Sequence, residues 1–494
     1  MPDDSVAVPA AKMTPMLRID RVKWERALTV AVLLAAVGFT FAQLHPSLLF
    51  ANTTPAGGDM GAHVWTPAYL RDHLLPHGRL TGWAPDWYGG FPALTFYFPL
   101  PSLMIVIADL VMPYNIAFKL ISVSGLLTLP VAAWFFARCM RLNFPGPLLV
   151  GIATVPFMFD RTFTIYGGNI ASTLAGEFAM SISISFCLVY LGLLAKVLET
   201  GKYRALAAAM LACVGLSHIV PSIIAIVGSL VLLAMHFKKE SFKRAIPVFI
   251  VAALIAAFWV VPFVMRMDYT NDMGWEKLMD WRKELGFKPA DPHSWLMPFG
   301  KYTLLFFWSF VGLVISIGRR SRMGLFAAAM AVISAVGFIY APQSRLWNAR
   351  LLPSWFFFLY VLAGVGIGEL ALGASWILNS LKRTVLGDKG EDETLEAFEF
   401  LPRLLAPVFG LAYVLIVVGM PLKQLPTWWP QKTVDHSFVV DWGAWNYSGY
   451  ERKAAYPEYR SLITTMEKVG KEHGCGRAMW EYEPELDRMG TPMA

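Results

Sequence analysis

A glycine-rich turn near the N-terminal end, Gly57-Gly58-Asp59-Met60-Gly61-Ala62-His63, holds the residues of this sequence that are best placed for chemistry. Glycines before the aspartate leave it with little steric cover. A general base, or a carboxylate that binds a metal, needs such access to its substrate. We therefore predict that Asp59 is catalytic and that His63 binds substrate. The alternative is an ordinary solvated turn aspartate.

Two aromatic regions are candidates for substrate contact. The stretch Trp83-Ala84-Pro85-Asp86-Trp87-Tyr88-Gly89-Gly90-Phe91-Pro92 follows the turn, and we predict that Trp87 and Tyr88 bind substrate. Residues 265–300 combine tryptophans with carboxylates, a pairing that suits sugars. Trp275 and Trp281 are therefore predicted to contact an acceptor, although tryptophan is also the usual anchor at a membrane interface.

Further candidates lie at the ends of apolar runs. In Tyr166-Gly167-Gly168-Asn169-Ile170-Ala171-Ser172-Thr173-Leu174-Ala175-Gly176-Glu177, we predict a catalytic role for Glu177 and substrate binding for Asn169. A carboxylate at a helix N-terminus is also ordinary dipole complementarity. His218 interrupts an apolar stretch over residues 204–237 that is too long for one helix, which predicts a hairpin with His218 at its tip. His218 is a further catalytic candidate, or a simple turn histidine.

The segment Gln343-Ser344-Arg345-Leu346-Trp347-Asn348-Ala349-Arg350 precedes another apolar run. Arginine holds phosphate through two hydrogen bonds at once, and a neighbouring tryptophan can stack beside the ligand. We predict that this segment binds substrate through four residues, namely Arg345, Trp347, Asn348 and Arg350. Arginines that reach from a span to the membrane surface would look the same.

The elements that must position these residues are membrane helices. The 494-residue chain is 56% hydrophobic and only 16% charged, with a mean hydropathy of +0.50, whereas soluble domains carry roughly 25% charged residues. Apolar runs of about 18 residues or more recur over residues 24–422, each long enough to cross the hydrocarbon core. The sequence predicts an all-α polytopic membrane protein with about eleven transmembrane helices.

The formal charge of +7 indicates topology rather than nucleic-acid binding, because the basic residues lie in short clusters between apolar runs. Those clusters are Arg18/Arg21/Lys23, Arg138/Arg141, Lys196/Lys202/Arg204, Lys238/Lys239/Lys243/Arg244, Arg319/Arg320/Arg322 and Lys382/Arg383. Placing them inside predicts a cytoplasmic tail (1–23), a transmembrane domain (24–425), outer loops over 45–94 and 265–300, and a cytoplasmic loop (376–402). All candidate site residues then lie on the outer side.

Two segments need separate treatment. Residues 94–112 are apolar enough to span, but a span there would break the charge pattern, so we predict a re-entrant or interfacial segment rich in proline. The alternative is that this segment spans and a later pair does not. Residues 426–494 are predicted to form a small extracytoplasmic α/β module, and the abrupt end of the sequence predicts a longer natural chain.

The first outer loop resembles a known family. The run Gly58-Asp59…His63…Trp87-Tyr88-Gly89-Gly90-Phe91-Pro92…Phe96-Tyr97-Phe98-Pro99-Leu100-Pro101 is similar to bacterial membrane proteins described as related to 6-pyruvoyl-tetrahydropterin synthase. The order of spans and loops resembles the GT-C superfamily of membrane glycosyltransferases, over roughly residues 24–422. The resemblance implies a catalytic carboxylate in the first loop, which favours Asp59. The usual pair of neighbouring acidic residues is absent, which leaves the use of a divalent cation open.

These observations favour a glycosyltransferase of the bacterial cytoplasmic membrane with its active site on the extracytoplasmic side. The resemblance implies a polyprenyl-phosphate sugar donor and a cell-envelope glycan or glycolipid acceptor. A transporter or flippase of a lipid-linked substrate is the main alternative, but it would use charges at mid-membrane and an inverted repeat. A non-catalytic envelope-assembly scaffold is a third reading.

Overall fold

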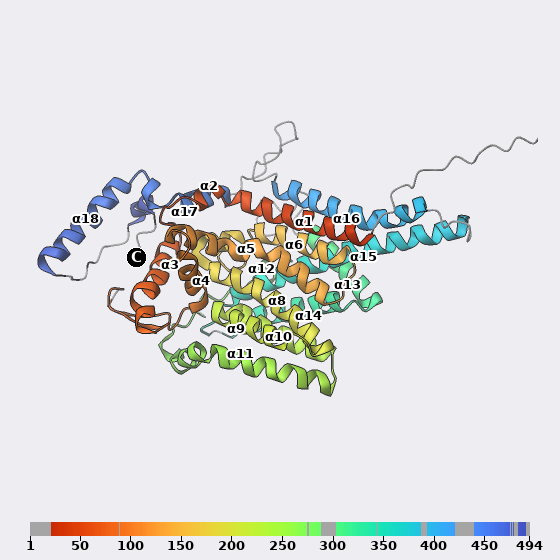
Figure 1. The fold of residues 1–494 in the computed structure, drawn as a ribbon, viewed down its shortest axis with the longest axis horizontal. Helices are drawn as coiled ribbons and strands as arrows, with labels where there is room; N and C mark the ends of the chain where they lie inside the picture. Colours follow the sequence, from red (N-terminus) through yellow and green to blue (C-terminus); the bar gives the residue numbers. More distant parts are fainter. Residues whose placement is uncertain are drawn as a thin grey trace, which may run out of the picture.

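A computed structural model describes residues 21–87, 89–273, 276–287, 303–342, 344–386, 393–419, 439–474, 476, 478 and 483–490. This part of the chain is almost entirely helical, and its long helices run side by side in one bundle (Figure 1).

Seven of the described helices belong to segments long and apolar enough to cross a membrane. They are α1 (Arg21–Gln43), α5 (Tyr114–Cys139), α8 (Phe178–Thr200), α11 (Lys239–Met265), α14 (Arg322–Tyr340), α15 (Leu352–Leu386) and α16 (Glu393–Gly419). Four shorter apolar helices lie among them: α6 (Gly146–Phe159), α9 (Arg204–Ser217), α10 (Ile219–Met235) and α13 (Thr303–Arg319). These helices cover the predicted runs, while the number that cross a membrane stays a prediction.

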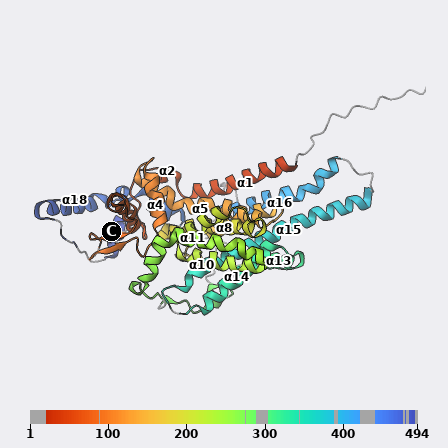
Figure 2. The ribbon, with the colours of Figure 1, turned by 60° about the horizontal axis from the view of Figure 1, so that its bottom comes forward.

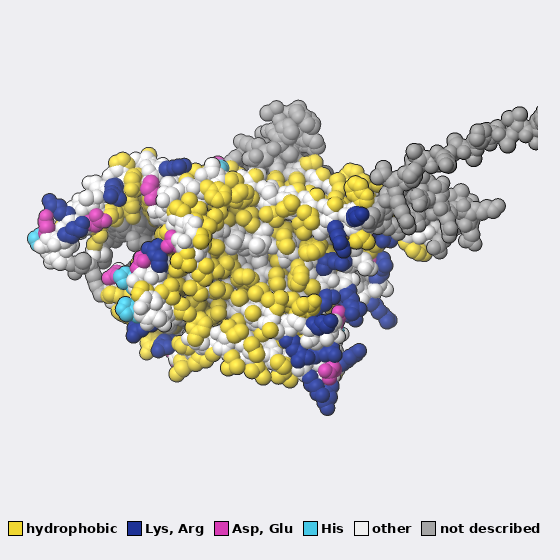
Figure 3. Space-filling model, viewed as in Figure 1, with side chains coloured by type: hydrophobic (Ala, Val, Ile, Leu, Met, Phe, Trp, Pro, Cys, Tyr) yellow, Lys and Arg dark blue, Asp and Glu magenta, His cyan; other side chains and the backbone are white. Residues whose placement is uncertain are grey.

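Helices α8 and α15 form the centre of the bundle. In their most apolar windows, 83% and 78% of the residues are buried, against 22% for α11 and 17% for α16. The outer helices instead show apolar side chains to the surroundings, such as Leu254 on α11 and Phe409 on α16. Figure 3 shows these side chains as a broad apolar belt. Such a large exposed apolar surface fits a lipid environment.

The predicted hairpin around His218 is present. Residue His218 has extended backbone (φ −169) between α9 and α10. At the far end of α10, the ring of His236 lies 3.4 Å from the Arg322 guanidinium, close to where α9 begins. The two helices therefore run in opposite directions, with His218 at the tip.

Residues 94–112 do not form a spanning helix. They contain α4 (Pro99–Asp109), whose 11 residues measure about 16 Å, half of the ~30 Å hydrocarbon core. Helix α4 packs against α5 and α9, and the indole of Trp259 donates a hydrogen bond of 2.9 Å to the Leu94 carbonyl. Protein covers this irregular segment, as its placement at membrane depth would require, and its re-entrant or interfacial position stays a prediction.

The first outer loop contains α2 (Pro46–Leu49), α3 (Met60–Tyr69) and a two-stranded antiparallel hairpin. Its strands are β1 (Gly82–Ala84) and β2 (Phe91–Ala93), with Trp83 opposite Pro92. The described part of the tail consists of α17 (Val439–Ser448), α18 (Tyr456–His473) and short 3-10 turns. The predicted α/β composition of the tail is therefore corrected: in the described residues the strands belong to the first loop.

The tail and the first loop are tied to the bundle by one buried lysine. The Lys119 ammonium on α5 donates hydrogen bonds to the carbonyls of Leu48 and Ala51 (3.0 Å each) and of Tyr447 (2.8 Å). It also donates to the Thr53 hydroxyl at 2.8 Å. Four acceptors offset the cost of burying the charge. The tail helices consequently lie at the same end of the bundle as α3 and α4, as Figures 1 and 2 both show.

The basic residues gather at the opposite end of the bundle (Figure 3). There the Glu199 carboxylate pairs with Arg141 at 2.9 Å and with Arg322 at 2.5 Å. Helix α8 joins the two ends: Glu177 precedes it and Glu199 lies in its last turn. Its 23 residues rise by about 34 Å. The basic residues that the structure describes thus gather at one end, as charge patterning predicts.

Candidate active site

Asp59 is held against the segment that precedes α8 by a close contact between two backbones. Its amide donates a hydrogen bond of 2.8 Å to the Ala175 carbonyl. Gly58 has a φ of +51, and a Cβ there would lie 2.7 Å from the Ala175 oxygen. A Cβ on Gly176 (φ +119) would lie 2.7 Å from the Cβ of Asp59. The glycines are therefore required for this approach as well as for the turn.

The tail closes the back of this turn. Asn446 on α17 is fully buried and donates a hydrogen bond of 2.7 Å to the Leu174 carbonyl. The backbone carbonyl of Asn446 accepts a hydrogen bond of 3.0 Å from the Ala56 amide. Asn446 stands in an Asn-Tyr-Ser sequence that matches a glycosylation signal. Its burial gives this asparagine a structural role instead.

Glu177 and Arg350 form the charged centre of the site. The Arg350 guanidinium donates one hydrogen bond to the Glu177 carboxylate and another, of 3.0 Å, to the Ile165 carbonyl. It also lies 5.8 Å from the centre of the Trp347 ring. Both charged side chains keep about a fifth of their surface exposed, 20% for Glu177 and 21% for Arg350. The pair is therefore reachable from outside.

His218 completes the cluster from the tip of the α9–α10 hairpin. Its Nδ1 accepts a hydrogen bond of 3.2 Å from the Val220 amide, which places the ring proton of the neutral form on Nε2. That Nε2 lies 4.0 Å from the Glu177 carboxylate. The ring packs on Phe98, with centroids 4.7 Å apart. The structure thus brings Asp59, Glu177, His218 and Arg350 to one end of the bundle.

His63 and Tyr97 lie beside Asp59. The His63 Nε2 is 3.4 Å from the Tyr97 hydroxyl, and burial lowers the pKa of His63 to about 4. The imidazole is therefore neutral at physiological pH and available for hydrogen bonding. Burial also raises the pKa of Tyr97. Sequence reasoning did not select Tyr97, although the Phe96-Tyr97-Phe98 run carried part of the family resemblance.

The pKa of Asp59 depends on its burial and on the charge of Arg350. Asp59 is exposed as a residue, yet surrounding protein atoms partly desolvate its carboxyl and raise its pKa, while the charge of Arg350 lowers it. A carboxylate with a raised pKa is a better proton acceptor than an isolated surface aspartate.

Two predicted substrate-binding residues have structural hydrogen bonds. The Asn348 amide nitrogen donates to the Leu278 and Phe338 carbonyls at 3.0 and 3.1 Å, and its oxygen accepts from the Leu278 amide at 3.0 Å. Asn169 is fully buried, where it caps the next helix by accepting from the Ser172 amide at 2.7 Å. We assign both residues positioning roles.

The aromatic candidates divide between two places. Trp87 packs on Trp65, which stacks on Tyr69, with both pairs of centroids 4.7 Å apart, so the first loop carries a row of rings. Trp281, within residues 265–300, is 39% exposed. Arg345 pairs with the exposed Asp268 at 3.2 Å and does not join the cluster. Tyr88 and Trp275 lie outside the described residues.

The described residues contain no group of three or more His, Cys, Asp or Glu side chains that could hold a metal ion. The site residues Asp59, Glu177, His218 and Arg350 combine carboxylates, an imidazole and one arginine, a set suited to moving a proton and neutralising an anion.

Comparison with known proteins places the chain in context. A family model described as "6-pyruvoyl-tetrahydropterin synthase related domain; membrane protein" matches residues 94–378. No curated protein matches. The oligosaccharyltransferase of Archaeoglobus fulgidus in its apo form is similar in fold, with a TM-score of 0.52, 11% identity and 94% of this chain covered. The chain spans 62% of that protein's length.

A second solved structure, ArnT from Cupriavidus metallidurans bound to undecaprenyl phosphate, aligns at 11% identity over 96% of this chain and 84% of its own, with a TM-score of 0.43. The chain therefore shares its fold with the Archaeoglobus fulgidus oligosaccharyltransferase.

Proposed function

We propose that this chain, which belongs to the family of 6-pyruvoyl-tetrahydropterin synthase-related membrane proteins, is a glycosyltransferase that takes its sugar from a polyprenyl-phosphate donor. The acceptor would be a cell-envelope glycan or glycolipid. The GT-C-like fold supports this proposal, because the oligosaccharyltransferase that shares it transfers a glycan.

The gathering of Asp59, Glu177 and Arg350 at one end of the bundle carries the proposal. These residues come from the first loop, the start of α8 and the start of α15, and the pairing of Arg350 with Glu177 holds them at the level where those helices begin. A polyprenyl chain stays in the bilayer and presents its phosphate at that level. An arginine there and a carboxylate beside it match what the donor and the acceptor each need.

The proposed reaction is a direct displacement. An acceptor hydroxyl oxygen attacks the anomeric carbon of the donor sugar, its proton passes to the Asp59 carboxylate, and the bond from the anomeric carbon to the phosphate oxygen breaks. The polyprenyl phosphate leaves with that electron pair, and Arg350 stabilises its charge. Glu177 orients the Arg350 guanidinium, and His218 supports Glu177 from the other side.

The orientation follows from the basic end. Lys and Arg near span ends stay on the cytoplasmic side, so the site would face the extracytoplasmic side of a bacterial cytoplasmic membrane. The partly exposed Arg350–Glu177 pair lies about 34 Å away from the basic end along α8.

Mass spectrometry of lipids that co-purify with the full chain, followed by incubation with a glycan acceptor, tests the function. We expect a polyprenyl-phosphate sugar, and its conversion to free polyprenyl phosphate and a lengthened acceptor. A transporter would bind the same lipid but release it unchanged, which would overturn the proposal.

A further inference from the structure

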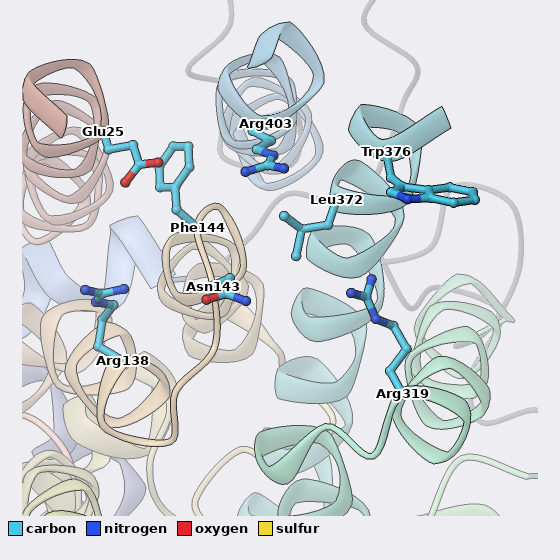
Figure 4. A pocket seen from close by; sticks show the side chains of 9 residues that line it. Glu25, Arg138, Asn143, Phe144, Arg319, Leu372, Trp376 and Arg403 are labelled. Carbon is cyan, nitrogen blue, oxygen red and sulfur yellow. The ribbon is translucent and has the colours of Figure 1, made fainter. Parts of the chain in front are cut away.

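The basic end of the bundle contains a cavity of about 620 Å³, far from the site described above. Three arginines from different elements line it: Arg138 at the end of α5, Arg319 at the end of α13 and Arg403 on α16. Trp376 on α15 and Phe144 add aromatic surface. Figure 4 shows the three guanidinium groups directed toward the space between these helices.

The described residues that line the cavity carry a surplus of positive charge. Glu25 on α1 is the carboxylate that lines it with the three arginines. Arg319 also pairs with the largely buried Glu369 at 2.9 Å, and the Arg403 Nε donates to the Ser375 hydroxyl at 3.1 Å. These contacts hold the guanidinium groups in fixed positions. Arginines held in this way suit the several oxygens of a phosphate group.

A second cavity of about 300 Å³ continues the basic surface. It shares Arg319 with the first and is also lined by Arg141, Arg320 and Arg322. Basic residues that only anchor the ends of spans would be scattered, whereas these arginines line two adjoining cavities. The arginines of the two cavities come from the end of α5, the connection between α13 and α14, and α16.

The cavity also has an apolar lining. Leu372 and Trp376 on α15 line it together with the arginines. Trp376 is 70% exposed, as expected of a ring at a membrane interface. A ligand that touches both the guanidinium groups and this ring has a phosphate and an apolar part.

We propose that this cavity binds the headgroup phosphate of an anionic phospholipid, with the exposed Trp376 ring beside the apolar part of the lipid. Basic pockets between helices on the cytoplasmic side of membrane proteins suit such headgroups. A zwitterionic lipid would bring a quaternary ammonium or amine toward the same arginines and be repelled. The lipid is distinct from the proposed donor, because its site lies at the opposite end of α8. The assignment of this lipid to the cytoplasmic leaflet rests on the proposed orientation, whereas the binding site itself does not.

Native mass spectrometry of the full chain tests this proposal, with phosphatidylglycerol or phosphatidylcholine added to the delipidated protein. We expect phosphatidylglycerol to be retained at least tenfold better than phosphatidylcholine. The variant Arg138→Gln/Arg403→Gln should lose that preference, since each charge-assisted contact is worth about tenfold or more. The control Lys202→Gln/Lys243→Gln removes two exposed cations from the same end and should keep it.

Three results would overturn the proposal. They are equal retention of the two lipids by the wild-type protein, equal loss of preference in the variant and the control, and displacement of the lipid by millimolar inorganic phosphate alone. The last would mean a site for free phosphate rather than for lipid. The wild-type comparison of the two lipids stands even if the double variant fails to fold.

Discussion

At the end of the bundle where α8 and α15 begin, one arginine, Arg350, is paired with Glu177 beside His218. At the basic end, Arg138, Arg319 and Arg403 line one cavity, where Glu25 is the one carboxylate among the described lining residues. Pairing with a carboxylate fixes the direction of a guanidinium and partly neutralises its charge. This suits a site where an anion must form and then leave. Gathered arginines hold an anion for longer, which suits a resident lipid.

The largest expected effect is at Asp59, which has no counterpart at the basic end. Replacing Asp59 with Asn should lower transfer by about 10²–10⁴-fold, because the amide cannot accept the acceptor proton. Donor binding and thermal stability should stay near wild type, since Asp59 is exposed and its side chain makes no helix-capping hydrogen bond. Turnover assays with a polyprenyl-phosphate sugar measure the effect. Near-normal turnover would make Asp59 a turn residue.

The pairing itself is tested by a mutant cycle. Arg350→Ala should weaken donor binding by about 1.5–3 kcal/mol, or roughly 10–150-fold, and should destabilise the fold by leaving Glu177 without its partner. The double variant Arg350→Ala/Glu177→Gln should recover stability but not donor binding. The control Arg345→Ala breaks an exposed pair and should change little. Recovery of donor binding in the double variant would contradict a phosphate contact by Arg350.

A smaller effect is expected from the backbone contact that places Asp59. Gly176→Ala puts a methyl group 2.7 Å from the Cβ of Asp59 at a φ of +119. Such strain costs about 1–3 kcal/mol, and we expect transfer to fall by about tenfold as Asp59 shifts. Gly38→Ala, where an added methyl meets nothing within 4 Å, is the matched control. Equal activities of the two variants would show that this contact does not set the position of Asp59.

The smallest effect concerns pH. A general base acts when deprotonated, so transfer should fall as the pH drops through the pKa of Asp59. Burial places that pKa above its ordinary value of 3.8, and the charge of Arg350 lowers it. Arg350→Gln should therefore move the acidic limb of the pH–rate profile to higher pH, whereas Arg350→Lys should leave it nearly in place. An unchanged limb in Arg350→Gln would separate the two groups electrostatically.

Much of the arrangement follows from the sequence. The alternation of apolar runs and basic clusters predicts the order of helices and the hairpin at His218. The same alternation brings Asp59, Glu177, His218 and Arg350 to one end, because each follows an odd number of predicted crossings. Each apolar run by itself predicts a membrane helix, and the short loops between runs allow few other paths of the chain across the membrane.

The fine structure of the site depends on contacts that no local pattern reveals. The Asn348 side chain is hydrogen-bonded to the Leu278 carbonyl, 70 residues earlier. The Asn446 side chain is hydrogen-bonded to the Leu174 carbonyl, 272 residues earlier. A polar residue at a predicted membrane boundary looks the same whether it faces substrate or another loop. The tail is predicted to be a small α/β module, but in its described residues α17 is a helix that contacts α2 of the first loop.

An experimental structure of the full chain with bound polyprenyl phosphate tests the central claim most directly. The account predicts the phosphate within hydrogen-bonding distance of the Arg350 guanidinium, with the Asp59 carboxylate facing the side from which an acceptor enters. A phosphate held by Arg138, Arg319 and Arg403, with nothing beside Arg350, would contradict it.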